Sequence, residues 1–225
     1  MTDKPRAVIF DIDDTLVDTT PSYRGSILAT ARHFGGTATL EDIARAKAKG
    51  DANNDWVLTR DLLVREGIDV PLEEVTRVFE DFYQGTDATP GLKEQETLLL
   101  ERSHILAIGQ KYPLGIVTGR PRKDALDFIV RHNLSNLFKV VVTMDDGPLK
   151  PNPFPVQRAL SVLKETDVWM IGDTPDDIRS AVGAGIKGIG VIAPADNPEE
   201  AKAAMLDAGA TLVLNSAKEI EELLL

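Results

Sequence analysis

From residue 89 onward, short apolar runs alternate with segments of helical pattern. The runs are rich in β-branched residues and lie at 113–118, 139–143, 168–172, 187–192 and 211–215. Helical patterns occupy a segment through Lys111, then 121–133, 153–164, 175–184, 197–208 and the C-terminal residues. A similar apolar run lies near the N-terminus, at 7–10. This alternation is typical of a parallel sheet that helices cover on both faces.

Between the first apolar run and residue 89, only helical patterns occur. Apolar residues recur at helical spacing from Tyr23 to Phe34, and further amphipathic segments lie at 39–49, 56–66 and 72–83. We therefore predict an α/β fold with a doubly wound, Rossmann-like parallel-sheet core. Residues 1–18 and 89–225 would form this core, and residues 19–88 would form an inserted, all-helical domain.

The composition is that of an ordinary globular protein with an acidic surface. Of its 225 residues, 43% are hydrophobic and 27% are charged, and the net charge is -11. That charge repels polyanions, so we expect neither nucleic acid nor an anionic membrane as a partner. The absence of cysteine excludes disulfides, thiolate catalysis and cysteine-ligated metals. Because no apolar run has the length of a signal-peptide core or a membrane span, we expect a cytoplasmic location. We also expect the protein to be a monomer or a homodimer.

Polar residues follow four of the predicted strands. In open α/β sheets, ligands bind beyond the carboxyl ends of the strands. The residues at these ends are Asp11, Asp13 and Asp14 after the first strand, Thr118 and Gly119 after the second, Lys150 after the third, and Asp173 and Asp177 after the fourth. We expect these groups to meet at one edge of the sheet.

The expected ligand set consists of oxygen atoms. Crowded carboxylates repel one another unless a cation joins them or one keeps its proton. There is no cysteine, and we interpret the three histidines, His33, His104 and His132, as structural. Oxygen ligands favour a hard cation, and we expect Mg²⁺. Such a cation, together with a lysine, a threonine hydroxyl and backbone N–H groups, is suited to holding a phosphoryl group, whose phosphorus a carboxylate can attack.

The order of these motifs resembles that of the haloacid dehalogenase superfamily. The matching stretches are DIDDT (11–15), Thr118 after an apolar strand, Lys150 before a proline, and GDTPDD (172–177). The helical insert directly after the first motif is similar to the small helical cap of the phosphoglycolate-phosphatase-like subfamily. The resemblance covers essentially the whole chain, and it implies Mg²⁺-dependent phosphoryl chemistry.

The resemblance implies roles for two carboxylates of the first motif. Asp11 would attack phosphorus and bind the metal. Asp13 would donate a proton to the leaving alcohol, later accept one from water, and bind the metal through its backbone carbonyl. The dehalogenases of the superfamily lack a carboxylate at the position of Asp13, so its presence favours phosphoryl transfer over carbon–halogen cleavage.

The resemblance also implies roles for the later motifs. Thr118 and the Gly119 amide would bind phosphate oxygens, and Lys150 would balance their charge. Asp173 would bind the metal directly, whereas Asp177 would either support it from further out or contribute to metal binding through Lys150 and water. Taken singly, each of these residues could be an ordinary turn or surface residue, and it is their common order that favours the functional interpretation.

The helical insert contains weaker candidates for substrate binding. Arg24 and Lys49 are cations suited to a second anionic group of a substrate. Asn54, with Asn53 or Trp56, is a candidate for contact with the substrate in the pocket. The alternative is a structural role, because tryptophan on an amphipathic helix commonly packs in a core and most arginine and lysine side chains are solvated.

These observations predict a phosphomonoester hydrolase that acts on a small phosphorylated metabolite through an aspartyl-phosphate. A phosphomutase on the same framework is one alternative. Phosphonate hydrolysis is another, and it would need a Schiff-base lysine in the insert, for which Lys47 and Lys49 are the nearby candidates. A non-catalytic, phosphorylatable binding or signalling module is the alternative from another class.

Overall fold

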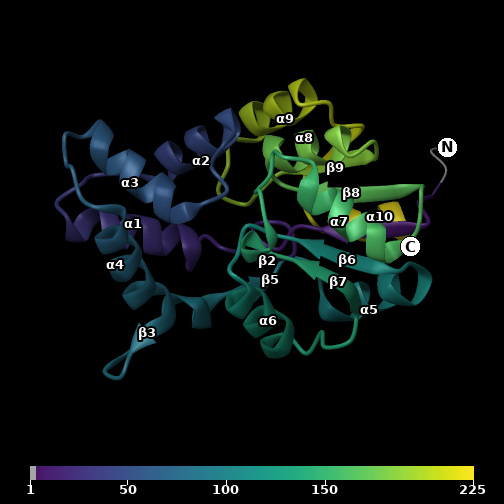
Figure 1. Cartoon of the computed structure of the whole chain (residues 1–225), viewed down its shortest axis with the longest axis horizontal. Coiled ribbons are helices and arrows are strands. Elements are labelled where there is room, and N and C mark those ends of the chain that lie inside the picture. Colours follow the sequence, from purple (N-terminus) through teal and green to yellow (C-terminus); the bar gives the residue numbers. More distant parts are fainter. Residues whose placement is uncertain (1–3) are drawn as a thin grey trace.

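The computed structural model describes residues 4–225 and contains a parallel sheet of six strands (Figure 1). The strands are β1 (Ala7–Phe10), β6 (Leu114–Val117), β7 (Phe138–Val142), β8 (Val168–Gly172), β9 (Lys187–Val191) and β10 (Leu212–Leu214). Their order in the sheet is β10-β9-β8-β1-β6-β7. The chain therefore extends the sheet to one side of β1 and then to the other, which confirms the predicted doubly wound α/β core.

Strand β1 lies at the centre of the sheet, hydrogen-bonded to β6 and β8, and all of its residues are buried. Its alternate side chains belong to different hydrophobic clusters. Val8 and Phe10 contribute to one cluster, and Ala7 and Ile9 contribute to the other. Because both faces of β1 are covered, its sequence is continuously apolar instead of alternating.

Helices cover both faces of the sheet. The cluster that contains Phe10 includes residues of α5 (Arg102–Lys111), α6 (Arg122–Arg131) and α10 (Glu219–Leu224). The cluster that contains Ile9 includes residues of α7 (Phe154–Leu163) and α8 (Pro175–Gly183), and α9 (Pro198–Asp207) packs beside α8.

Four further helices form a layer to one side of the sheet (Figure 1). They are α1 (Tyr23–His33), α2 (Leu40–Lys49), α3 (Asp55–Arg65) and α4 (Leu72–Gln84). We call them the four-helix layer. Their buried apolar side chains, among them Ile27, Leu62 and Phe79, form a hydrophobic cluster of their own. All four helices fall inside the predicted insert at 19–88, and the boundaries of that domain stay a prediction.

Short elements that the sequence did not predict join the four-helix layer to the sheet. Strand β2 (Val17–Asp18) pairs in antiparallel orientation with β5 (Thr97–Leu98), and β3 (Gly85–Thr86) pairs with β4 (Thr89–Pro90). The predicted helix through Lys111 begins only at Arg102, after a 3₁₀ turn and β5. The reason is that residues 97–99 pair with residues 16–18, on the segment by which the chain leaves the sheet for the four-helix layer. The Leu99 amide donates to the Leu16 carbonyl at 2.9 Å.

None of the helices formed by residues 4–225 combines the length and the apolar character that crossing a bilayer requires.

Candidate active site

The carboxyl ends of three adjacent strands bring the predicted motifs together. Strands β6, β1 and β8 are neighbours in the sheet, and Thr118, Asp11 and Asp173 directly follow them. All three side chains are buried. Residues that are more than 160 positions apart in sequence therefore meet at one edge, as the strand pattern predicted.

Lys150 connects the first motif to the last. Its ammonium nitrogen lies 3.0 Å from Oδ1 of Asp11 and 2.5 Å from Oδ1 of Asp177, and its side chain is 2% exposed. It also donates to the Val117 carbonyl at 3.4 Å. A buried ammonium requires such partners, because an unpaired charge is costly away from water.

Asp177 uses both of its carboxylate oxygens within the protein. Oδ1 pairs with Lys150, and Oδ2 accepts hydrogen bonds from the Thr174 amide at 3.0 Å and the Thr174 hydroxyl at 2.6 Å. These latter bonds form a capping box at the start of α8. Gly172 is required beside them, since a Cβ at that position would lie 2.3 Å from Cγ of Asp177. The supporting role predicted for Asp177 stays a prediction.

The carboxylates of Asp11, Asp173 and Asp177 could hold a divalent metal ion. Each offers an oxygen atom within 4.8 Å of the others, and all three residues are buried. With the Lys150 ammonium, the three carboxylates leave a net charge of two negative units, which a divalent cation would balance. The donor set consists of oxygen, as hard cations prefer.

The protonation of these carboxylates reflects first their burial and then their crowding. Burial raises the pKa of Asp11 to about 7, although the nearby Lys150 acts to lower it. Burial also raises the pKa of Asp173 well above its usual range, and the neighbouring carboxylates of Asp177, Asp14 and Asp11 raise it further. Without a cation the cluster therefore tends to retain protons, and a bound metal would displace them.

The side chain of Asp13 points to a different partner. Its Oδ1 accepts from Nε of Arg120 at 2.7 Å and lies 2.6 Å from Nη2. Burial raises the pKa of Asp13, whereas the Arg120 guanidinium acts to lower it. The Asp13 carboxylate is not among the three that converge for a metal, and the metal contact through its backbone carbonyl stays a prediction.

The turn after β6 lies directly against the four-helix layer. Oγ1 of Thr118 accepts from the Arg120 amide at 3.1 Å, and the Thr118 amide donates to the Val142 carbonyl at 3.0 Å. A Cβ on Gly119 would lie 2.6 Å from the carbonyl oxygen of Asn53, so a larger residue does not fit there. The absence of a side chain at Gly119 thus permits the close approach of the helical layer.

A small cavity lies between the sheet edge and the four-helix layer. The sheet side contributes Asp11, Asp13, residues 119–121, Met144, Asp173 and Thr174, and the helical side contributes Tyr23, Lys47 and residues 53–56. The predicted nucleophile, the predicted proton donor and Gly119 therefore share one cavity with residues of the insert.

Two predicted cations of the insert do not reach this cavity. Arg24 is 0% exposed and lies away from it, with Asp14 at 2.7 Å and Asp196 at 2.7 Å. The predicted contact between Arg24 and substrate is therefore not supported, because both carboxylates hold its guanidinium inside the protein. Lys49 is exposed and does not line the cavity either.

Other residues of the insert do line the cavity. Asn54 does so, as predicted, but its Oδ1 also caps α3 by accepting from the Trp56 amide at 3.1 Å. Lys47, which the sequence suggested only as a Schiff-base candidate, reaches the cavity from α2 and pairs with Asp55 at 3.1 Å. Residue spacing gave no signal for Tyr23, which also borders the cavity.

A loop of the insert is bound to the start of α8. Nδ2 of Asn53 donates to Oδ2 of Asp176 at 2.6 Å and to the Lys150 carbonyl at 2.9 Å. Burial and the neighbouring Asp177 carboxylate raise the pKa of Asp176, whereas hydrogen bonds from the backbone amides of Asp51 and Ala52 act to lower it. Asp176 thus holds residues 51–53 against the site.

Comparison with known proteins gives consistent matches. The sequence model of the family described as "Haloacid dehalogenase-like hydrolase" matches residues 8–191. An "Imidazoleglycerol-phosphate dehydratase" of Phytophthora nicotianae is 41% identical over 84% of this chain, and the chain spans 44% of that protein. A "Phosphoglycolate phosphatase" of Aliivibrio fischeri is 27% identical, with 80% of this chain and 81% of that protein covered. A "Pyrophosphatase PpaX" of Anoxybacillus flavithermus is 31% identical, with 82% of both chains covered.

Solved structures share the fold. The structure of a "predicted phosphoglycolate phosphatase" from Haemophilus somnus superposes with a TM-score of 0.75 at 17% identity, with 99% of both chains covered. A haloacid dehalogenase-like protein from Agrobacterium tumefaciens superposes with a TM-score of 0.76 at 17% identity, with 96% of both chains covered. At these identities, the likeness shows that the architecture is common to all three proteins.

Proposed function

Because the chain belongs to the haloacid dehalogenase-like hydrolase family, we propose that it is a Mg²⁺-dependent phosphomonoester hydrolase that acts on a small phosphorylated metabolite. The observation that carries this proposal is the position of Lys150, whose ammonium lies 3.0 Å from Asp11 in the cluster that also contains Asp173. A carboxylate nucleophile beside an ammonium and a set of oxygen ligands meets the needs of phosphoryl transfer. Relatives named phosphoglycolate phosphatase and pyrophosphatase support hydrolysis.

The proposed reaction has two displacements at phosphorus. An oxygen of Asp11 attacks phosphorus, and the ester bond breaks as Asp13 gives a proton to the leaving alcohol. Asp13, now ionised, accepts a proton from water as the water oxygen attacks phosphorus. The bond between phosphorus and Asp11 then breaks, which releases inorganic phosphate and restores the Asp11 carboxylate.

Other groups of the site would stabilise charge during both displacements. Thr118 and the Gly119 amide would bind phosphoryl oxygens, and Lys150 would offset their negative charge. Asp11 and Asp173 would hold Mg²⁺, with Asp177 supporting them. The ion would supply positive charge to the phosphoryl oxygens and so lower the energy of the transition state.

We propose that the substrate is small, because the four-helix layer covers the cavity and leaves little space over Gly119. A panel of substrates should include phosphoglycolate, pyrophosphate and an imidazole-bearing phosphate ester, which the names of the relatives suggest. It should also include sugar phosphates. Activation of turnover by a trace of sugar bisphosphate would instead indicate a phosphomutase, which returns the phosphoryl group to substrate.

The test is turnover of p-nitrophenyl phosphate with and without Mg²⁺. We expect the wild-type protein to need the ion, and Asp11→Asn to lower turnover at least about 1,000-fold because it removes the nucleophile. Asp61→Asn, a change at an exposed carboxylate on α3, serves as the matched control and should have no effect. Equal rates for wild type and Asp11→Asn would reject catalysis at this site and favour a non-catalytic module.

A further inference from the structure

Arg120 is a fully buried arginine that joins two carboxylates from different parts of the chain. Its side chain is 0% exposed. Nε and Nη2 contact Oδ1 of Asp13 at 2.7 and 2.6 Å, and Nη2 also lies 2.9 Å from Oε1 of Glu96. Glu96 lies between the 3₁₀ turn and β5, on the segment by which the chain returns from the four-helix layer. The guanidinium therefore connects the predicted proton donor to that return segment.

Glu96 is held by several donors besides Arg120. Its Oε1 accepts from the Ser22 hydroxyl at 3.0 Å and the Tyr83 hydroxyl at 3.3 Å, and its Oε2 lies 3.5 Å from Nη1 of Arg131. Asp13 and Glu96 together with Arg120 and Arg131 make a cluster in which the formal charges cancel. Such pairing keeps a buried guanidinium charged and fixed in orientation.

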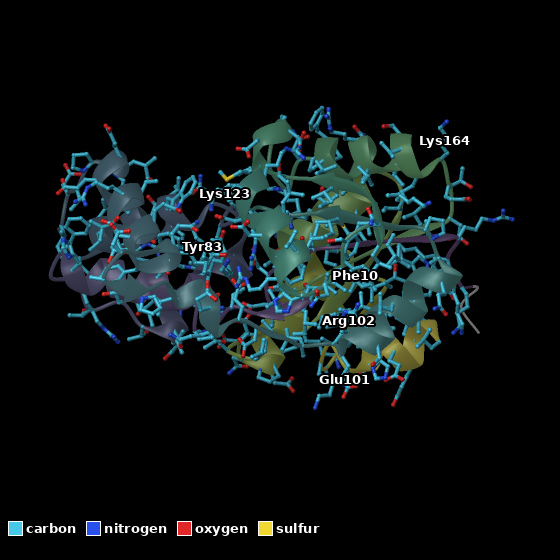
Figure 2. All side chains as sticks on the ribbon, turned by 90° about the horizontal axis from the view of Figure 1, so that it is seen from below. Phe10, Tyr83, Glu101, Arg102, Lys123 and Lys164 are labelled. Atoms are coloured by element: carbon cyan, nitrogen blue, oxygen red, sulfur yellow. The ribbon has the colours of Figure 1, made fainter. Side chains whose placement is uncertain are left out.

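Arg120 also contacts the first and the last helix of the four-helix layer. Its guanidinium lies 4.8 Å from the centre of the Tyr23 ring on α1, and its Nη1 donates to the Tyr83 hydroxyl on α4 at 3.2 Å. Figure 2 shows Tyr83 on the side of the layer that faces the α/β part, in which Phe10 lies. A displacement of either helix relative to the sheet must therefore disturb the contacts of Arg120.

The backbone of Arg120 is fixed by the turn after β6, which contains Thr118 and Gly119. Its amide donates to Oγ1 of Thr118, and its carbonyl accepts from the Met144 amide at 3.1 Å. With the backbone and the guanidinium both held, Oδ1 of Asp13 has a defined position. No donor from residues 4–225 is bonded to Oδ2 of Asp13, whose side chain is 20% exposed and lines the cavity.

We propose that Arg120 is a positioning residue that holds Oδ1 of Asp13, so that Oδ2 of Asp13 is directed at the reacting ester. Because Arg120 also contacts α1 and α4, the orientation of Asp13 depends on the position of the four-helix layer. This inference rests on the proposed function, because it assigns Arg120 a task in the proton transfers of Asp13. Proton transfer requires the donor within hydrogen-bond reach of the leaving oxygen, so a small displacement of Oδ2 slows the reaction.

The test compares Arg120→Lys with wild type. A lysine cannot contact Asp13 and Glu96 in the forked geometry of a guanidinium. We expect kcat to fall about 10–100-fold, with KM changed less than about threefold, because the binding groups are untouched. The loss should be larger for an alkyl phosphate than for p-nitrophenyl phosphate, whose leaving group needs little protonation. Arg122→Lys is the matched control: the exposed side chain of Arg122, at the start of α6, pairs with Asp146, and kcat should not change.

A double-mutant cycle separates positioning from a general structural effect. If Arg120 acts through Asp13, Arg120→Lys should change the residual turnover of Asp13→Asn by less than about twofold, whereas independent effects would multiply. Full kcat in Arg120→Lys, or an equal loss in the wild-type and Asp13→Asn backgrounds, would overturn the inference.

Two measurements distinguish failure of the positioning role from misfolding of the variant and from failure of the proposed function. If thermal unfolding shows that Arg120→Lys does not fold, Glu96→Gln, which weakens the hold on Arg120, takes its place in the same cycle with the same expected and contradicting results. Failure of the proposed function would instead appear in the wild type, as turnover that does not depend on Asp11.

Discussion

Lys150 is the residue on which the charge balance of the site depends most. Its ammonium is the cation that contacts both Asp11 and Asp177, in a cluster of three buried carboxylates. Removing one partner of a buried ion pair leaves the other charges uncompensated. A bound divalent ion can offset part of that loss, so the role of Lys150 can be measured with and without metal.

Lys150→Met should therefore impair both stability and activity. We expect the free energy of unfolding to fall by about 3–5 kcal/mol in the presence of a chelator, because an ammonium is removed from a buried ion pair. We expect a smaller loss with saturating Mg²⁺. Denaturant unfolding under both conditions measures the difference. Lys202→Met, at an exposed position on α9, is the control. Wild-type stability of Lys150→Met in chelator would contradict the assigned ion pairs.

The raised pKa of Asp11 predicts how stability and metal binding depend on pH. Its folded pKa is about 7, against an ordinary value of 3.8 for an aspartate carboxyl. Between these values the folded state holds a proton that the unfolded state has lost, so metal-free stability should fall as pH rises from about 4 to 7. Metal binding displaces that proton. The increase in melting temperature on adding Mg²⁺ should accordingly be larger at pH 8 than at pH 5. A shift of equal size at both pH values would show that Asp11 is not a ligand.

At the residue scale, the motifs predicted which residues meet at the carboxyl ends of the strands. Asp11, Asp173 and Lys150 follow strands of one parallel sheet, so their convergence could be expected from the sequence. The partners of Arg24 and Arg120 could not be, because they depend on packing between segments up to 172 residues apart. Glu96 in particular has no local pattern that marks it as buried.

At the element scale, the loop that precedes α3 connects the four-helix layer to the active site. Asp176 at the start of α8 accepts from Asn53, which also donates to the Lys150 carbonyl. A carboxylate that accepts from an amide group across two layers stabilises the contact between them. We infer that this is a closed arrangement, and that the loop separates to admit substrate when those bonds break.

Asp176→Ala should weaken this closed arrangement. We expect KM to rise about tenfold, the factor for loss of one charge-assisted hydrogen bond of about 1.5 kcal/mol. We expect kcat to change less, because Asp11, Asp13 and Lys150 are retained. Steady-state kinetics on the best substrate of the panel measures both constants. Asp207→Ala, an exposed change on α9, is the control. An unchanged KM would mean that this contact does not contribute to substrate binding.

The longer elements were predictable and the connecting ones were not. Helices and strands of the core have a clear period or a continuous apolar run, and, apart from the helix through Lys111, each occurs close to its predicted range. Strands β2 and β5 contain two residues each, too few for any period to appear. Their pairing depends on contacts between residues near 17 and 97, which also explains why the helix through Lys111 starts late.

At the scale of the whole molecule, one cavity lies between the sheet edge and the four-helix layer, whose apolar side chains belong to separate hydrophobic clusters. The apolar side chains of the layer pack among themselves, and those of the sheet pack against the other helices. Contacts between the two parts include hydrogen bonds, such as those of Arg120 with Tyr83 and of Asp176 with Asn53. This division suits an enzyme that opens for substrate and closes for reaction.

The central claim is that Asp11 carries the phosphoryl group between the two displacements. It can be tested by mixing the Asp13→Asn variant, in which attack by water is slowed, with p-nitrophenyl phosphate and Mg²⁺, followed by acid quenching and mass spectrometry of the peptides. The account predicts the mass of one added phosphoryl group on Asp11, and none when Asp11→Asn is introduced as well. Turnover by the wild type with the phosphoryl group on another residue, or unaffected by Asp11→Asn, would contradict it.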